Sequence, residues 1–474
     1  MTAYSFLRGR SHRGGFSCLL ALLAIASSAN GQAGVDRHAT TRHGSVATTT
    51  KAPAPSIPPQ QDVVQQATAC LPTDCDCPAD LDCGCDIGCG DTLGCGDLVG
   101  CNGPNIGLTG RPLRLHSPWF RAEYLAWWVD RADTPALVST SPSADGLATA
   151  GQLDAANTEV LFGNGPTVDS IQSGVRFSGG FLLNPHNGLA IEASHFRIDE
   201  SDGDFSADNT QFDVLARPFE NVETGSEGEN AIVIAFPGLL DGSVNIRSTS
   251  SFEGTEVLLA RPSINNGCSR WDFLLGWRNA RLEESLTVSD FREVTGTGSG
   301  LAVGTTLASA DAFNTRTEFN GGVVGIAARE NRGRLTWEGA VKLGIGGSAT
   351  RASISGVTNT STPDGSGGTI ESTAGNGLLA QASNSGVFER DDFALVPELR
   401  VGVSYKLGRR LRATAGYSLL YVSRVQRANQ LVDRQVNLSQ IPPSSLVGPA
   451  APAFAWEVDG LLAQGFNVGL EARY

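Results

Sequence analysis

The chain has 474 residues, among them 57 glycines and a single methionine, and its formal net charge is −14. The length would allow two or three ordinary soluble domains. The acidity argues against a nucleic-acid partner, because no stripe of Lys and Arg is present that could displace counterions from phosphates.

The first thirty residues resemble a secretory signal. Arg8, Arg10 and Arg13 precede a short apolar run, and small residues near Ala29 and Gly31 offer cleavage sites. The run is shorter than the roughly twenty residues that a membrane helix needs. We therefore expect a signal peptide over residues 1–31 and an exported chain. No later apolar stretch is long enough for a membrane helix, so a membrane-inserted mature chain would have to be a closed β-barrel.

Residues 32–69 are rich in Ala, Thr, Pro, Gln and Ser, which predicts a flexible linker. A cysteine-rich segment follows over residues 70–105, and part of it repeats every six residues from Cys89. In an exported protein such an even cluster favours disulfides, with a thiolate metal site or cross-links to other envelope proteins as the alternatives. The eight disulfide candidates are Cys70, Cys75, Cys77, Cys83, Cys85, Cys89, Cys95 and Cys101. Cys268 is left over beside a turn, and we expect a buried or idle thiol there.

From Trp119 onward the sequence alternates apolar and polar residues in stretches of about ten, which is the length of a tilted membrane strand. The pattern predicts ten strands within residues 117–474. They are Trp119–Val129, Gly174–Leu183, Leu189–Ile198, Phe252–Arg261, Arg270–Arg281, Thr317–Ala328, Arg334–Gly346, Phe393–Lys406, Leu411–Val422 and Gly465–Tyr474.

The connections between these strands alternate in length. Short turns are predicted at Asn184–Gly188, Pro262–Gly267, Arg329–Gly333 and Leu407–Arg410. Long polar loops are predicted at Asp130–Ser173, Asp199–Ser251, Ser289–Arg316, Gly347–Asp392 and Ser423–Gln464. This alternation is typical of an up-and-down antiparallel transmembrane β-barrel with tight periplasmic turns and long external loops. A count of twelve strands stays open if Asn157–Phe162 or Ala349–Ser355 forms extra pairs.

The final strand places Phe466, Val468, Leu470 and Tyr474 on one face and ends on an aromatic residue. This pattern resembles the C-terminal signal that barrel-assembly machinery recognises in outer-membrane proteins.

Several segments resemble the β-barrel porin-7 family of outer-membrane proteins, found mainly in planctomycetes. The matching segments are Pro118–Trp128, Thr134–Val138, Leu274–Arg278, Leu282–Glu284, Thr414–Tyr421, Arg427–Gln430, Asp433, Val436–Asn437 and the final strand. One departure is Ala428-Asn429-Gln430, where a Gly-Asp-Gln-like triplet is expected. The resemblance implies an outer-membrane barrel that contacts outer-membrane lipid.

Charged residues on the polar parity of the strands are predicted to line the lumen. These are Arg121, Glu123, Arg176, Glu192, Asp272, Arg278, Glu318, Glu338, Lys342, Glu398, Arg400, Arg412, Glu471 and Arg473. A ten-stranded barrel is narrow, so these charges would either interlock as a plug or line a path for small solutes. The acidic loops favour cations as those solutes.

Three functions remain open at this point. The first is a porin for passive diffusion of small solutes or ions, and the second is a non-conducting, envelope-anchoring barrel cross-linked through its cysteines. The third, an outer-membrane hydrolase, has little support, because only His186 and His195 follow Ser117 and no G-x-S-x-G or H-E-x-x-H motif is present. The sequence thus predicts no catalytic residues and no cofactor. The acidic stretch Asp199–Asn209 reads as a solvated loop, with calcium binding as the alternative.

Overall fold

The computed structural model describes residues 116–130, 132–164, 171–441, 444–457 and 459–474. The expected signal peptide, linker and cysteine-rich segment, with all eight disulfide candidates, lie outside these residues. The described part is all-β, and its only helical elements are four single 3-10 turns: Ser143–Asp145, Leu147–Thr149, Asn429–Leu431 and Leu438–Gln440. Within it, no helix is long and apolar enough to span a membrane.

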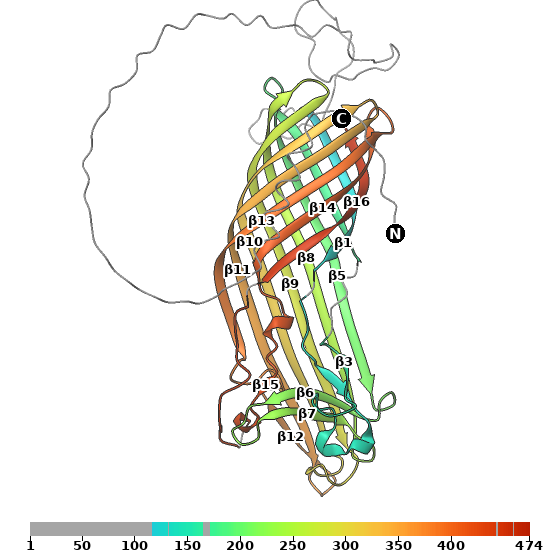
Figure 1. Cartoon of the computed structure of the whole chain (residues 1–474), viewed down its shortest axis with the longest axis vertical. Helices are drawn as coiled ribbons and strands as arrows, with labels where there is room; N and C mark the ends of the chain where they lie inside the picture. Colours follow the sequence, from blue (N-terminus) through green and yellow to red (C-terminus); the bar gives the residue numbers. More distant parts are fainter. Residues whose placement is uncertain (1–115, 131, 165–170, 442–443, 458) are drawn as a thin grey trace, which may run out of the picture. The chain divides into compact units, whose positions relative to one another are not determined.

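Ten antiparallel strands close into a ring (Figure 1). They are β1 (His116–Val129), β4 (Ile171–Asn184), β5 (Leu189–Asp208), β8 (Leu240–Asn265), β9 (Ser269–Val294), β10 (Thr306–Arg332), β11 (Leu335–Pro363), β13 (Gly386–Lys406), β14 (Leu411–Val425) and β16 (Asp459–Arg473). Each strand pairs with its neighbour in the chain, and β1 pairs with β16 from Trp119↔Arg473 to Val129↔Ala463. All ten predicted strands are present, and closure leaves the paired part of the ring without a free edge.

The connections alternate between short and long, as the sequence indicates. Two to four residues join β4 to β5, β8 to β9, β10 to β11, and β13 to β14. Gly267 and Gly333 reverse the chain in two of these turns with φ of +83° and +61°, in the left-handed region that glycine occupies without strain. We call this side of the barrel the turn end, and both β1 and β16 have their outer termini there.

The predicted long loops are partly wrong, because six strands run well past the expected ten residues. The strands β5, β8, β9, β10, β11 and β13 continue beyond the point where β1, β4, β14 and β16 stop pairing, and they form a wall on one side of the barrel (Figure 1). The acidic stretch from Asp199 to Asp208 is thus part of β5 and not a loop.

The remaining strands form a small second sheet at the far end of the wall. It contains β2 (Val138–Thr140), β3 (Glu159–Phe162), β6 (Leu215–Asn221), β7 (Gly228–Ala235) and β15 (Gln435–Val436), whereas β12 (Thr369–Ala374) pairs with β11. We call this sheet with its connecting loops the cap. The suggested extra barrel strands are not found, since Glu159–Phe162 pairs with β2 in the cap and Ala349–Ser355 lies inside β11.

Apolar side chains join the cap to the inner face of the wall. Leu215 and Phe219 of β6 pack in one buried cluster with Ile246 of β8, Leu286 of β9 and Phe313 of β10. Burial of this kind contributes about 25 cal/mol for each Å² of apolar surface removed from water. The cap is therefore held by a core of its own and fills the space inside the wall.

Candidate functional site in the barrel lumen

Alternation along each strand decides which side chains enter the lumen. On β1, for example, Arg121, Glu123, Leu125 and Trp127 point inward, whereas Phe120 and Tyr124 are about half exposed on the outer face. The inward set changes in character along the barrel axis. From the turn end it reads as two charged tiers, then an apolar layer, then a second set of ion pairs under the cap.

The inner tier is a compact ion cluster of seven residues. Its members are Glu123, Arg176, Glu256, Arg278, Lys342, Glu398 and Arg400. Lys342 Nζ lies 2.8 Å from a Glu398 oxygen and also contacts Glu256. Arg278 contacts both of these glutamates as well. All but Arg400 are less than 10% exposed, so these ion pairs lie away from bulk water.

Arg400 is the loosely held member of the inner tier. Its guanidinium lies 3.7 Å from Glu123 Oε2 and 3.4 Å from Glu398 Oε1, and it makes no hydrogen bond within the described residues. Its side chain is 26% exposed. Glu123 is more firmly engaged, because Asn467 Nδ2 donates to it at 2.7 Å.

A second tier, which we call the mouth tier, lies between the inner tier and the turns. It contains Arg121, Glu192, Arg270, Asp272, Arg329, Glu338, Arg412, Glu471 and Arg473. Arg121 is its centre, with Glu338 at 2.8 Å and Glu471 in direct contact. Arg412 is inward by strand parity and has no ion pair within the described part of the chain.

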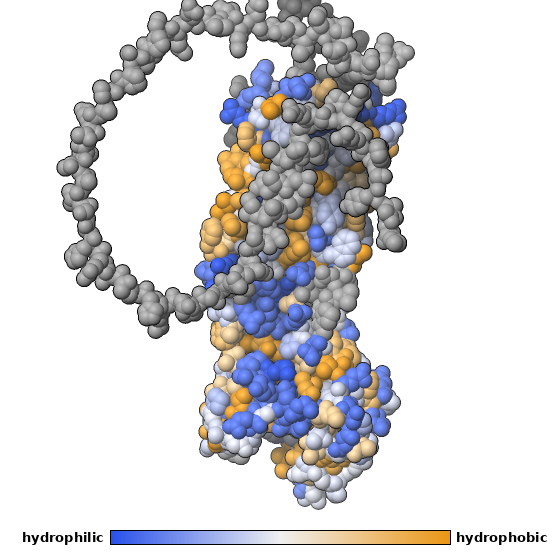
Figure 2. Space-filling view, in the orientation of Figure 1, coloured by the Kyte–Doolittle hydropathy of each residue, from blue (hydrophilic) through white to orange (hydrophobic). Residues whose placement is uncertain are grey.

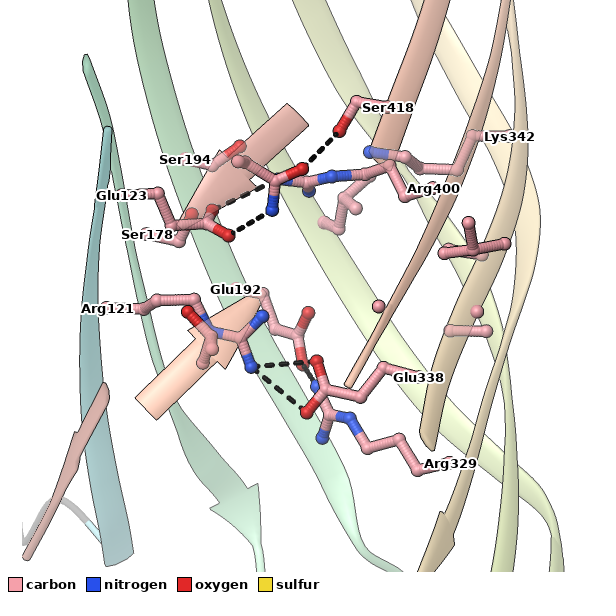
Figure 3. Close-up of a pocket in the computed structure, with 18 of the residues that line it drawn as sticks. Arg121, Glu123, Ser178, Glu192, Ser194, Arg329, Glu338, Lys342, Arg400 and Ser418 are labelled. Carbon is pink, nitrogen blue, oxygen red and sulfur yellow. Dashed lines mark hydrogen bonds and ion pairs between the residues drawn. The ribbon is translucent and has the colours of Figure 1, made fainter. Parts of the chain in front are cut away.

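A recess lies between the two tiers and is shown in Figure 3. The volume of this recess is about 120 Å³. In the figure Arg121, Glu338, Glu192 and Arg329 form one group, and Glu123, Arg400, Lys342 and Ser418 form a second group deeper in the barrel. Solvent can therefore reach the face of the inner tier that turns toward the mouth.

Beyond the inner tier the lumen is filled by apolar side chains, which we call the apolar layer. Fifteen buried residues from eight of the ten strands form one cluster there. Across it, the ring of Trp127 lies 5.5 Å from that of Phe196, and Phe196 lies 5.2 Å from Phe252. Phe319 of β10 is fully buried in the same layer. The two strands that do not contribute to the cluster place polar residues at this level, Gln172 opposite Trp127 and Ser348 opposite Phe319. The lining is therefore mostly apolar, which disfavours a hydrated solute.

Three segments that carry the family resemblance meet on the far side of the apolar layer. Arg427, in the connection that follows β14, contacts Glu284 of β9 at 2.7 Å and donates to the carbonyl of Asp130. Asn429 donates to Thr134 Oγ1 at 2.6 Å and to the carbonyl of Ala132. The departure noted above thus places an asparagine where it ties two connections together.

Two arginines under the cap show how the ion pairs there are held. Burial lowers the pKa of the Arg427 guanidinium, but the charge and hydrogen bond of Glu284, together with the charges of Asp130 and Asp459, leave this pKa above its usual value. Burial acts in the same way on Arg217 of β6, whose pKa is nevertheless raised by Asp311 and Asp290. Arg217 contacts Asp290 at 2.8 Å and also Asp311, so the cap is fixed to β9 and β10 by charge as well as by packing.

The outer face of the barrel carries an apolar belt near the turn end. On β9 the exposed residues of the belt are Phe273, Leu275 and Trp277, and the other strands contribute in the same way. Figure 2 shows apolar residues gathered over this part of the visible face, with hydrophilic residues at the turns. The belt ends at a row of outward ion pairs that we call the outer charged row: Glu253, Arg281, Glu283, Arg316, Glu318, Arg351 and Glu389.

The structure brings most of the sequence-predicted residues into the two tiers. The exception is Glu318, which lies in the outer charged row beside Arg316 at 3.1 Å. Its neighbour Phe319 points inward instead. Odd-numbered and even-numbered residues of the stretch 321–328 are alike small or apolar. Alternation alone could therefore not show which face of β10 points into the lumen.

The lumen residues predicted from the sequence did not include Arg217, Arg270, Arg329 or Arg427. The sequence also did not indicate that aromatic residues of the apolar layer fill the lumen. Arg270 could have been predicted to face the lumen, because it lies two residues before Asp272 on the same strand and therefore on the same face. The prediction for Cys268 is also partly wrong, since this cysteine is exposed and unpaired. His195 lies on the outer face, bonded to Thr255 Oγ1, and His186 lies in a turn. No group of three or more His, Cys, Asp or Glu in the described ranges is placed to hold a metal ion.

Comparison with known protein families shows which family the chain belongs to. Residues 119–474 match the family described as "Putative beta barrel porin-7", which covers the whole ring and its cap. The chain belongs to the porin-7 family. A porin family implies a protein of the outer membrane. No curated protein matches the sequence.

Proposed function

We propose that this porin-7 barrel spans the outer membrane with its lumen closed, as a membrane-anchored scaffold and not as an open diffusion pore. The apolar belt supports the membrane-spanning part, because outward side chains of a transmembrane strand must match lipid while inward ones need not. The outer charged row supports a membrane boundary at the end of the belt. The cap would then stand outside the bilayer.

The observation that carries the closed state is the apolar layer. An eight-stranded barrel is already filled by its own side chains, and ten strands add little width. Here Trp127, Phe196, Phe252 and Phe319 occupy the lumen beyond a tier of interlocked charges. Hydrophobic constrictions of this type block ions by expelling water.

Passive diffusion of small solutes is the second candidate function, and the recess is the observation that favours it. A solute that entered from the turn end would reach Arg400 and Lys342 without moving any strand. Passage beyond that point would require both the inner tier and the apolar layer to open. A diffusing pore would therefore need a conformational change.

Barrels of this type place short turns in the periplasm. Both ends of the ring lie at the turn end, so the residues before β1 would enter the oxidising periplasm, where the cysteine-rich segment forms disulfides or cross-links to other envelope proteins. A scaffold that carries such a segment accounts for an appendage that a diffusion pore does not need.

Planar-bilayer recording of the detergent-folded mature chain tests the proposal. We expect no discrete openings for the wild type. Openings are expected for a variant that combines Trp127→Ala and Phe319→Ala, which truncate two fully buried rings of the apolar layer, with Lys342→Ala and Glu256→Ala, which remove one ion pair of the inner tier. Phe393→Ala is the matched control, since it removes a ring from the lipid-facing side. Stable openings of the wild type would overturn the closed state and favour diffusion.

A further inference from the structure

We propose that the recess between the two charged tiers is a binding site for one small anion, of the size of phosphate or formate, held by Arg400. This inference rests on the interior of the barrel and does not depend on whether the lumen conducts.

The charge of the inner tier is not balanced. Arg176, Arg278, Lys342 and Arg400 supply four cations, and Glu123, Glu256 and Glu398 supply only three carboxylates. The mouth tier repeats the imbalance with five arginines against four carboxylates. The two tiers together thus hold nine cations and seven carboxylates, although the whole chain carries a net charge of −14.

An uncompensated charge is costly at this depth. The inner tier is closed on one side by the apolar layer and surrounded by the belt, so little water reaches it. Lys342 lies between two glutamates at hydrogen-bonding distance, and a neutral amine would satisfy them poorly. All four cations of the inner tier therefore stay charged. An anion that enters through the recess would balance the fourth cation and stabilise the tier.

Arg400 is the inner-tier cation whose hydrogen-bond donors are not used by other residues of the described chain. The other three inner-tier cations each donate a hydrogen bond to a carboxylate or a hydroxyl, whereas the nearest carboxylates of Arg400 are 3.4 and 3.7 Å away. Guanidinium groups bind phosphates and carboxylates in a bidentate manner. Arg400 faces the recess and is the most exposed residue of its tier.

Two hydroxyls complete the site. Ser178 and Thr414 line the recess, are 9% and 6% exposed, and have side-chain oxygens without a hydrogen-bond partner in the described residues. Buried hydroxyls are normally paired, so an unpaired one facing a cavity indicates a missing acceptor or water. Three of the four carboxylates that line the recess, Glu256, Glu338 and Glu192, are already engaged by Lys342, Arg121 and Arg329. The fourth, Glu123, accepts from Asn467 through Oε1, and its Oε2 has no hydrogen-bond partner in the described residues. An anion bound to Arg400 would give the two hydroxyls an acceptor of their own.

Thermal unfolding of the full detergent-folded chain tests the site, with inorganic phosphate and formate as probes at constant ionic strength. We expect either anion at saturation to raise the unfolding midpoint of the wild type by about 2 to 5 °C. Arg400→Gln leaves three cations against three carboxylates, so it should lose this response while staying as stable as the wild type without anion. Arg400→Lys should respond weakly, and Arg351→Gln, on the outer face, should respond fully.

Isothermal titration with phosphate provides the second measurement. We expect one anion per barrel for the wild type and at least about tenfold weaker binding for Arg400→Gln. The inference is overturned if the wild type shows no anion response, or if Arg400→Gln keeps it. It is also overturned if Arg400→Gln folds but is strongly destabilised without anion, because the arginine would then be a structural counter-ion.

Discussion

The guanidinium of Arg427 and the carboxylate of Glu284 meet at 2.7 Å on the far side of the apolar layer, where they join the connection after β14 to the wall. Both side chains are more than 90% buried. Glu284 also accepts from the backbone N–H of Ala428. The pair therefore fixes a long connection over the lumen.

The first prediction concerns this pair. Glu284→Gln leaves the charge of Arg427 buried without its counter-ion, which costs about 3 to 5 kcal/mol when one partner of a buried pair is removed. We expect the unfolding midpoint of the detergent-folded protein to fall by several degrees. Replacing both partners, with Glu284→Leu and Arg427→Met, should recover most of the loss. A single variant as stable as the wild type would show that the pair contributes nothing.

The second prediction concerns the cap. Asp311 contacts Arg217 and accepts backbone N–H donors from Leu379 at 3.2 Å and Ala380 at 2.8 Å. Asp311→Ala should release residues 375–385 and speed their amide hydrogen exchange by roughly tenfold or more, while the ring stays protected. Asp364→Ala is the control, because Asp364 caps only an exposed turn. Unchanged exchange in residues 375–385 would refute this anchoring role.

The third prediction locates the membrane boundary on β9. Leu275 lies in the belt and Thr287 lies on the same outward face beyond the outer charged row. Leu275→Arg should cost about 2 to 4 kcal/mol in folding into lipid vesicles, whereas Thr287→Arg should cost about 1 kcal/mol or less. Equilibrium urea titrations in vesicles measure both values. Equal penalties at the two positions would contradict a bilayer that ends at the row.

The fourth prediction separates assembly in cells from folding in the test tube. Tyr474 contributes one backbone hydrogen bond, to the carbonyl of Pro118, and its side chain is 73% exposed. Its deletion should barely change refolding into detergent. If barrel-assembly machinery reads the terminal residue, the same deletion should lower the folded fraction in cells several-fold, measured by heat-modifiable migration. Leu407→Ala, an exposed apolar residue of a turn, should leave assembly in cells intact.

The sequence predicted the ring because strand alternation and connection length both follow from local chemistry. Strand ends were missed for one reason: the expected length was that of a bilayer. On β9 the alternation continues past Arg281 through the inward residues Leu286 and Val288, and these residues pack against the cap. The alternation of apolar and polar residues is present in the sequence of this extension. The sequence of β9 alone does not indicate that the cap packs against it.

The partners of the lumen charges could not be read from the sequence. Arg121 reaches Glu338 across 217 positions of the chain, and Arg278 reaches Glu398 across 120. Which inward charges share a level depends on the register of every strand around the ring. The sequence could therefore predict most of the charged residues that face the lumen. It could not predict that Arg400 makes no hydrogen bond, or that the inner tier has one carboxylate fewer than it has cations.

The pairing of β1 with β16 has a consequence for biosynthesis. The first strand of the ring finds one of its two partners only when β16 has been made, more than 330 positions later. Until then every intermediate exposes a strand edge and a lipid-facing surface in water, a combination that invites aggregation. A barrel that enters a membrane as proposed would therefore have to arrive there before its ring closes. A nonsense codon anywhere before β16 would leave an open sheet instead of a shorter barrel.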